Sequence, residues 1–216
     1  MTVMKTRSTR LWNTLAGASL IIFLVFTYGV LFQQAWVHSF DNYWYHTIHH
    51  FATPPLTAFF TYFTKLGNVM PLIAFVVGTC LILLVVNHPK ASAFLFINTL
   101  GLAIPVNTII KSLINRPRPK LAHLVQVHSS SFPSGHSMSI MILCGSLIII
   151  VNAFLKKQSE KVMLDLLFIV MIILIGISRI YVGVHFASDV VGGWSLGFCL
   201  LRISKFVFSK IGGEPL

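Results

Sequence analysis

PSGHSMSIMILCGSLIIIVNAFL, residues 133–155, is the stretch that decides the fold. It opens with Pro-Ser-Gly-His and continues as an almost unbroken apolar run, close to the roughly 20 residues that a helix needs to cross a bilayer. A helix is required there, because unpaired backbone groups cannot be satisfied in lipid. Pro133 suits the first helical turn, where a backbone N–H has no partner in any case. The stretch therefore predicts a membrane-spanning helix with a polar start.

The rest of the chain also has the composition of a membrane protein. Of its 216 residues, 56% are hydrophobic and only 10% are charged, whereas soluble domains carry about 25% charged residues. The net charge of +11 reflects scarce acids and not a basic tract, so nucleic acid is not an expected partner. Cys80, Cys144 and Cys199 lie far apart inside apolar runs. We expect them to pack in the membrane and not to form a disulfide or a zinc site.

The apolar runs predict an all-α, six-transmembrane-helix bundle that forms a single domain over residues 1–216. Trp12 and Trp36 bracket the first run as two aromatic belts of a bilayer, and that run is too long for a cleaved signal peptide. The run 56–66 is too short to span, so it is expected at the interface together with the aromatic stretch 40–51. The six predicted spans are 12–36, 69–86, 91–110, 134–155, 162–178 and 190–208.

The short loops predict an orientation. With both termini in the cytoplasm, ten of the 16 Lys and Arg side chains lie on the cytoplasmic side of the plasma membrane. This distribution obeys the positive-inside rule. Four of the remaining cations crowd into residues 111–120. Basic charge on this disfavoured outer side indicates a role other than topology.

Three polar clusters fall at helix ends on the same outer side. Helix ends that are distant in the sequence can converge on one face of a bundle, so we expect the clusters to form one site. They are Lys111 with Arg118-Pro119, then Pro133-Ser134-Gly135-His136, and then Ser178-Arg179 with His185 and Asp189.

The cations of these clusters suit a phosphate group. A phosphate ester spreads negative charge over its oxygens in the transition state, and Lys111, Arg118 and Arg179 can surround that charge. Free N–H groups at a helix start point at an anion, and Gly135 lets the anion come close. The Ser134 hydroxyl can add a donor to the phosphate or serve as a plain N-cap.

Two histidines divide the expected chemistry. Asp189 follows His185 by one helical turn, so its carboxylate can hold the far ring nitrogen in the arrangement of a nucleophile and its orienting group. His136 has no such partner in the sequence and is expected to protonate the departing alkoxide as a general acid. The pattern predicts cleavage of a phosphate ester through a phosphohistidine intermediate.

The clusters resemble the type 2 phosphatidic acid phosphatase (PAP2) superfamily of lipid phosphatases. Its three-part pattern, Lys-x6-Arg-Pro, Pro-Ser-Gly-His and Ser-Arg-x5-His-x3-Asp, is complete here between residues 111 and 189. The resemblance implies lipid phosphate hydrolysis without a metal or cofactor, with His185 as nucleophile and a site open to the outer leaflet. Among bacterial members, the chain is similar to the phosphatidylglycerophosphate phosphatase B and undecaprenyl diphosphate phosphatase group. Phosphatidylglycerophosphate, undecaprenyl diphosphate and phosphatidate remain open as substrates.

A transporter or flippase of phosphorylated lipids is the alternative from another functional class. Such a protein would bind the phosphate with the same cations and cleave nothing. A nucleophile with its orienting carboxylate and a separate acid argue against it, because binding alone needs only the cations. Membrane lipids are the expected partners, and no obligate protein partner is inferred.

Several residues near the clusters have open roles. Arg116 and Lys120 flank the motif arginine and could contact a second phosphate or lie among lipid headgroups. His123 and His128 could border the site, although exposed loop positions are the simpler expectation. Three further histidines have a helical spacing that could ligate a metal, but their aromatic setting favours an interface helix. These are His46, His49 and His50.

Overall fold

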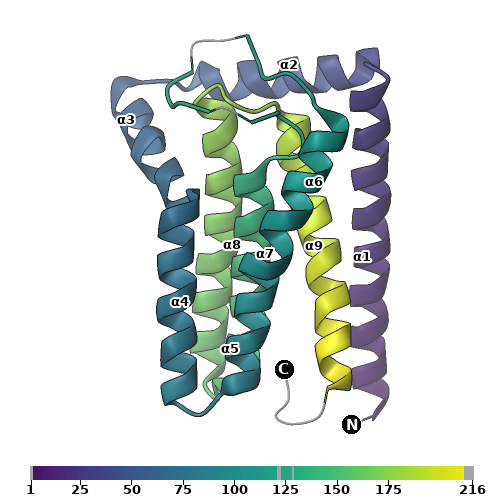
Figure 1. Cartoon of the computed structure of the whole chain (residues 1–216), viewed down its shortest axis with the longest axis vertical. Coiled ribbons are helices and arrows are strands. Elements are labelled where there is room, and N and C mark those ends of the chain that lie inside the picture. The colour runs from purple at the N-terminus through teal and green to yellow at the C-terminus, as the bar shows by residue number, and fades with distance from the viewer. Residues whose placement is uncertain (1, 121–122, 128, 212–216) are drawn as a thin grey trace.

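The computed structural model describes residues 2–120, 123–127 and 129–211, with the backbone alone for residues 2–9. Within these ranges the chain is helical and has no β-strand. Figure 1 shows a bundle of long helices with one further helix lying across its upper end. In the described ranges five helical paths are long and apolar enough to cross a membrane, and a bent helix pair brings the number to six if it is counted as one span. The chain is therefore a multi-pass membrane protein.

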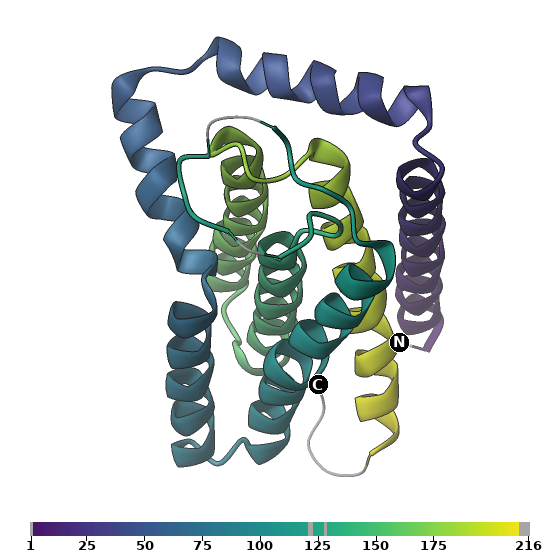
Figure 2. The same cartoon turned by 45° about the horizontal axis from the view of Figure 1, so that its top comes forward.

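The first two helices meet at a sharp turn. α1 (Thr2–Leu31) is a long helix at the edge of the bundle, and α2 (Ala35–His50) lies across the bundle end. Gln33 between them takes a left-handed backbone conformation with φ 47°, which allows the chain to turn sharply from α1 into α2 within a few residues. Figure 2 shows α2 passing over the ends of the other helices, from α1 towards α3. α2 is the interfacial segment expected after the first span.

The first span is shorter than the predicted range 12–36. Its helix ends at Leu31, and Trp36 belongs to α2, so Trp36 does not close the first span as an aromatic belt. Apolar residues continue past the turn because α2 packs back on α1. Val37 is only 1% exposed, and a Cβ on Gly29 would lie 2.4 Å from its side chain. Hydrophobicity alone therefore could not locate this turn.

The second span is bent. α3 (Pro54–Phe63) runs into the 3-10 turn η1 (Thr64–Gly67), and α4 (Val69–Val85) follows after Asn68. The two parts of this pair are bent by 55°. The run 56–66, which we expected at the interface, falls in α3 and η1, the oblique part of this pair (Figure 1). The bend itself borders the functional site described below.

The third span is one continuous helical path. α5 (Pro89–Phe96) passes through the π-helix η2 (Ile97–Ala103) into α6 (Ile104–Ile114). α6 ends at Asn115, which has a left-handed φ of 46°. This span is longer than the predicted range 91–110 and carries Lys111 in its last turn.

The last three spans form the centre of the bundle. They are α7 (Gly135–Phe154), α8 (Gln158–Tyr181) and α9 (Ala187–Lys210). α7 packs on both α8 and α9, and α1 covers the other side of α9. α7 and α9 pack closely at Gly193, where a Cβ would lie only 2.6 Å from the Ser134 carbonyl oxygen. This contact brings the N-terminal ends of α7 and α9 together, where two of the polar clusters lie.

Candidate active site

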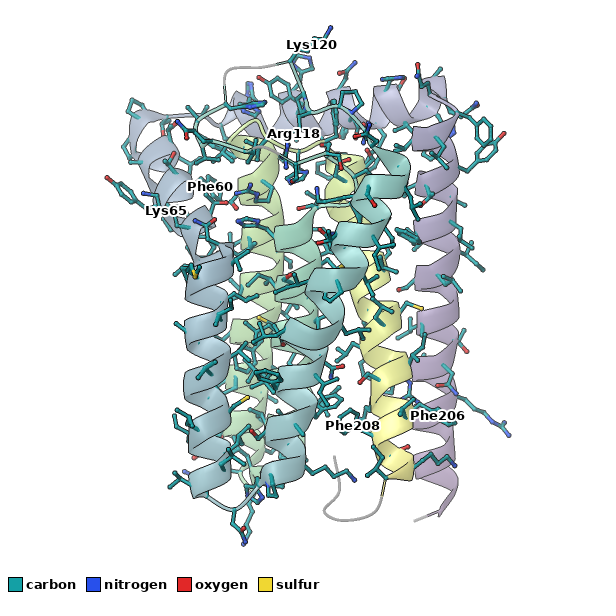
Figure 3. All side chains as sticks on the ribbon, in the orientation of Figure 1. Phe60, Lys65, Arg118, Lys120, Phe206 and Phe208 are labelled. Carbon is teal, nitrogen blue, oxygen red and sulfur yellow. The ribbon has the colours of Figure 1, made fainter. Side chains whose placement is uncertain are left out.

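The three polar clusters meet at the end of the bundle that α2 covers. Figure 3 places Arg118 within this end and Lys120 at its outer surface. A cavity of about 530 Å³ opens there, bordered by the bend before α4, by α6, by the start of α7 and by the end of α8. Among its lining residues are six of the predicted ones: Lys111, Arg118, Gly135, His136, Arg179 and His185.

His185 and Asp189 form the expected pair. His185 Nδ1 lies 3.2 Å from Asp189 Oδ2, and both side chains are buried. The same oxygen accepts a hydrogen bond from the Phe186 backbone N–H at 2.9 Å and another from the Ser131 hydroxyl. Since Asp189 lies in the first turn of α9, its carboxylate reaches back to the residue that precedes the helix. The carboxylate is held in place and can fix the ring of His185.

The other ring nitrogen of His185 faces the cavity cations. Arg118 Nη1 lies 3.3 Å from His185 Nε2, and a guanidinium can only donate. Nε2 therefore accepts, and Nδ1 carries the proton that is donated to Asp189. Burial lowers the pKa of His185 to about 3, although the hydrogen bond to Asp189 acts in the opposite direction. A neutral ring with an unprotonated Nε2 is the form that a nucleophile requires.

Backbone carbonyls hold two of the cations against the cavity. Lys111 Nζ donates to the Ser131 carbonyl at 3.2 Å and to the carbonyl of the preceding residue. Arg118 donates to the Ser129 carbonyl at 2.7 Å and to the Val184 carbonyl at 2.6 Å. Because these acceptors are neutral, both positive charges remain available to an anion in the cavity.

The third cation lies deeper. Arg179 is only 2% exposed and donates from Nη1 to the Thr64 hydroxyl at 2.6 Å. Its Nε has no hydrogen-bond partner. Ser178 donates to the same hydroxyl at 3.0 Å, so the motif Ser-Arg dipeptide ties α8 to η1. A buried guanidinium with an unsatisfied N–H next to the cavity is suited to a phosphate oxygen.

The Pro-Ser-Gly-His cluster starts α7 with Ser134 as its N-cap, so Pro133 lies before the helix and not in its first turn as expected. Ser134 is fully buried, caps the helix by accepting from the Ser137 N–H at 3.4 Å, and does not line the cavity. The N-cap interpretation of Ser134 therefore fits better than a direct phosphate donor. Gly135 does line the cavity, and a Cβ there would lie 2.9 Å from Asn107 Oδ1.

His136 has a partner that the sequence did not reveal. Its Nε2 lies 2.9 Å from Asn68 Oδ1, at the bend between η1 and α4. A Cβ on Gly67 would lie 2.6 Å from the imidazole ring, so only glycine leaves room for the ring at this position. Because Nε2–H donates to Asn68, Nδ1 is the nitrogen left for a substrate. Asn68 is far from His136 in the sequence and carried no motif that could identify it.

Arg116 fits neither of its expected roles. It is buried, with Nη1 2.6 Å from Asp189 Oδ1 and Nη2 2.8 Å from Asp41 Oδ2. It cannot reach a second phosphate or lipid headgroups without breaking these two ion pairs. Asp41 was also missed as a site residue. The available signal was a single carboxylate within an aromatic helix of a membrane protein, which is costly unless it is paired.

The remaining candidates lie outside the site. Lys120 is exposed, and His123 is exposed with its Nε2 2.9 Å from the Pro119 carbonyl oxygen. His128 lies outside the described residues. His49 uses both ring nitrogens on backbone carbonyls, at 2.9 and 3.0 Å, which disfavours metal ligation. Across the described ranges no group of three or more potential metal ligands occurs.

Comparisons with known proteins agree with this architecture. Residues 92–211 match the model of the PAP2 superfamily. Over 111 residues the chain is 40% identical to phosphatidylglycerophosphatase B of Bacillus subtilis, covering 49% of this chain and 53% of that protein. The match thus spans about half the length of this curated relative.

Two crystal structures have similar folds. One is a transmembrane PAP2-type phosphatidylglycerolphosphate phosphatase from Bacillus subtilis, with a TM-score of 0.82 and 29% identity over 91% of this chain and 97% of that chain. The other is LpxE of Aquifex aeolicus, with a TM-score of 0.59 and 28% identity over 74% of this chain and 91% of that chain. With more than half of its length matched by the family model and with its three polar clusters at one cavity, the chain belongs to the PAP2 superfamily.

Proposed function

We propose that the chain is a membrane phosphatase that hydrolyses a lipid phosphate monoester or diphosphate through a phosphohistidine at His185. The observation that carries the proposal is the orientation of the His185 ring. Nδ1 is held by Asp189, and Nε2 faces a cavity that also contains three cations. Binding of a phosphate requires only the cations, so this orientation favours hydrolysis over transport.

The reaction would proceed in two displacements. In the first, the His185 Nε2 lone pair attacks phosphorus and the bond to the lipid oxygen breaks, while His136, protonated on both ring nitrogens, donates its Nδ1 proton to the departing oxygen. In the second, water attacks the phosphohistidine while His136 takes up the proton of that water. Inorganic phosphate leaves, and both histidines return to their starting forms. Lys111, Arg118 and Arg179 would stabilise the charge on the phosphoryl oxygens throughout.

Phosphatidylglycerophosphate is the first candidate substrate. It is the lipid named in both Bacillus subtilis matches, the curated relative and the crystal structure. Undecaprenyl diphosphate and phosphatidate present the same phosphate chemistry to the cavity and stay as alternatives. No metal or cofactor is proposed, because the three fixed cations supply the charge stabilisation.

We also propose an orientation for this single membrane domain. The start of α1 and the end of α9 lie at one end of the bundle, opposite the cavity (Figure 1). The excess of basic residues near that end favours a cytoplasmic location for both termini. The cavity would then open at the outer face of the plasma membrane.

A phosphate-release assay with purified protein in detergent tests the proposal. The three lipids are compared side by side, with the His185→Ala variant as control. We expect release from at least one lipid by the wild type and none by the variant. Lipid movement across vesicles without any phosphate release would instead support a flippase.

A further inference from the structure

Asp189 has a second set of partners on the side away from His185. Its Oδ2 serves His185, the Phe186 N–H and Ser131. Its Oδ1 accepts from Arg116 Nη1 at 2.6 Å. The carboxylate that orients the nucleophile is thus itself held by a guanidinium that does not line the cavity.

Arg116 is in turn fixed by the interfacial helix α2. Its Nη2 donates to Asp41 Oδ2 at 2.8 Å, and its guanidinium lies 4.0 Å from the centre of the Phe186 ring. Asp41 also accepts from the Ser188 N–H at 2.8 Å and from the Ser188 hydroxyl at 2.9 Å. The chain of contacts runs from α2 through Arg116 to the first turn of α9.

All four polar side chains of this contact network are buried. Arg116 is 9% exposed, Asp41 4%, and Ser188 and Asp189 0%. Burial raises the pKa of Asp41, and the Arg116 guanidinium opposes that shift. Removing one member of a buried ion pair leaves the partner's charge uncompensated, which is strongly destabilising. Loss of any one of the three charged side chains should therefore destabilise the fold around the others.

Arg116 and Arg118 are close in the sequence but differ in what they can do. Arg118 lies 3.3 Å from His185 Nε2 and can contact a bound phosphate. Arg116 faces the opposite side of the pair, so it can act on the reaction only through the neighbours of His185 that it contacts, above all Asp189. Loss of Arg116 should therefore reduce the rate of attack without weakening phosphate binding.

We propose that Arg116 and Asp41 are positioning residues, which fix the orientation of the Asp189–His185 pair by linking Asp189 to α2. The inference rests on the proposed phosphatase function. In this arrangement the guanidinium fork spans the carboxylates of α2 and α9, a geometry that lysine cannot reproduce. The interfacial helix thereby contributes to the alignment of the nucleophile.

The test separates turnover from phosphate binding. We expect Arg116→Gln to lower kcat by about tenfold or more, since a charge-assisted bond to the orienting carboxylate is lost. The inhibition constant of inorganic phosphate should stay that of the wild type. Arg118→Gln is the matched comparison and should raise that constant. Glu160→Gln removes an exposed ion pair of 3.1 Å and should change neither quantity.

A double variant distinguishes positioning from a structural role alone. Arg116→Gln leaves two buried carboxylates, Asp41 and Asp189, without a guanidinium partner. The double variant Asp41→Asn with Arg116→Gln leaves only the Asp189 carboxylate without one. The double variant should therefore regain thermal stability but not kcat, measured on the folded fraction from size-exclusion chromatography. Arg116→Lys, which keeps the charge but not the fork, should recover only part of kcat.

Three outcomes would overturn the inference. The first is a wild-type kcat in folded Arg116→Gln. The second is a phosphate inhibition constant of Arg116→Gln that rises as it does in Arg118→Gln. The third is a double variant in which kcat returns together with thermal stability. If Arg116→Gln does not fold, the double variant and Arg116→Lys carry the same test. Failure of the proposed function would be recognised separately, because the wild type itself would then release no phosphate.

Discussion

Asn68 Oδ1 accepts a hydrogen bond from His136 Nε2 at 2.9 Å, so the break between α3 and α4 holds the histidine at the start of α7. This contact ties the bend of the second span to the cavity. It also assigns the two ring nitrogens of His136 different tasks. Nε2 is occupied by Asn68, and Nδ1 is the nitrogen that would pass a proton to the leaving group.

Asn68→Leu should slow the proton transfer that we assign to His136. We expect kcat on a lipid phosphate to fall by about tenfold or more, because the ring loses its orienting acceptor. Activity on nitrophenyl phosphate, whose leaving group needs no proton, should fall much less. Steady-state kinetics with both substrates measure the difference.

Asn13→Leu is the matched control, since Asn13 bonds Arg202 at an exposed position away from the site. It should leave both activities unchanged. An equal loss on the two substrates in Asn68→Leu would contradict a role of Asn68 in proton transfer.

Most of the fold could be predicted from hydrophobicity. The last three spans differ from the predicted ranges by only a few residues, because charged loops interrupt the apolar runs there. The end of the first span and the pairing of α3 with α4 in the second could not be predicted. Only Gln33 and Gln34 interrupt the apolar residues at the turn after α1, too short a polar stretch to separate two segments by hydrophobicity. Lys65, Gly67 and Asn68 mark the start of α4, but they do not show that α3 and α4 form one bent pair.

The cavity residues could be predicted because their spacing forms a recognisable pattern. Their partners could not be, because Asp41 and Asn68 lie far from the motifs in sequence and reach the site only through packing. Arg116 shows the limit most clearly. It lies between Lys111 and Arg118 in the sequence, yet its side chain points to Asp189 and Asp41 and away from the cavity.

Acid should destabilise the protein through His185. Its folded-state pKa of about 3 lies below the ordinary value of about 6.5, so the unfolded chain binds a proton first as the pH falls. The stability from burying the neutral ring is complete above pH ~6.5 and is lost progressively down to pH ~3. Thermal melting in detergent without phosphate should show this loss.

The His185→Asn variant isolates the contribution of the histidine, because the other titrating groups remain. Its melting temperature should fall less than that of the wild type between pH 7 and pH 4.5. Parallel curves for the two proteins would mean that His185 is not buried as a neutral ring.

Activity should survive an excess of chelator. Lys111, Arg118 and Arg179 provide the positive charge that a metal ion would otherwise bring to the phosphoryl oxygens. Phosphate release is measured before and after EDTA treatment and dialysis. Complete loss of activity that magnesium or zinc restores would contradict the proposed mechanism.

The cavity end should face outwards in intact cells. Lys120 is exposed at that end (Figure 3), and Gln158 begins α8 at the opposite end. Cys80, Cys144 and Cys199 are buried, so they should give little background. A membrane-impermeant thiol reagent should label Lys120→Cys but not Gln158→Cys. Labelling of Gln158→Cys alone would invert the proposed topology.

His185 and His136 should differ in how far an activated substrate can rescue them. His185→Ala removes the atom that attacks phosphorus, so no phosphoenzyme can form from any substrate. His136→Ala removes a proton donor worth roughly 100-fold or more on a lipid phosphate, but nitrophenoxide leaves without a proton. Nitrophenyl phosphate should therefore restore the first displacement of His136→Ala in part and leave His185→Ala inactive. A rapid-quench assay for phosphohistidine should detect the intermediate in wild type and His136→Ala only. Equal rescue of both variants, or of neither, would show that the two roles are wrongly assigned.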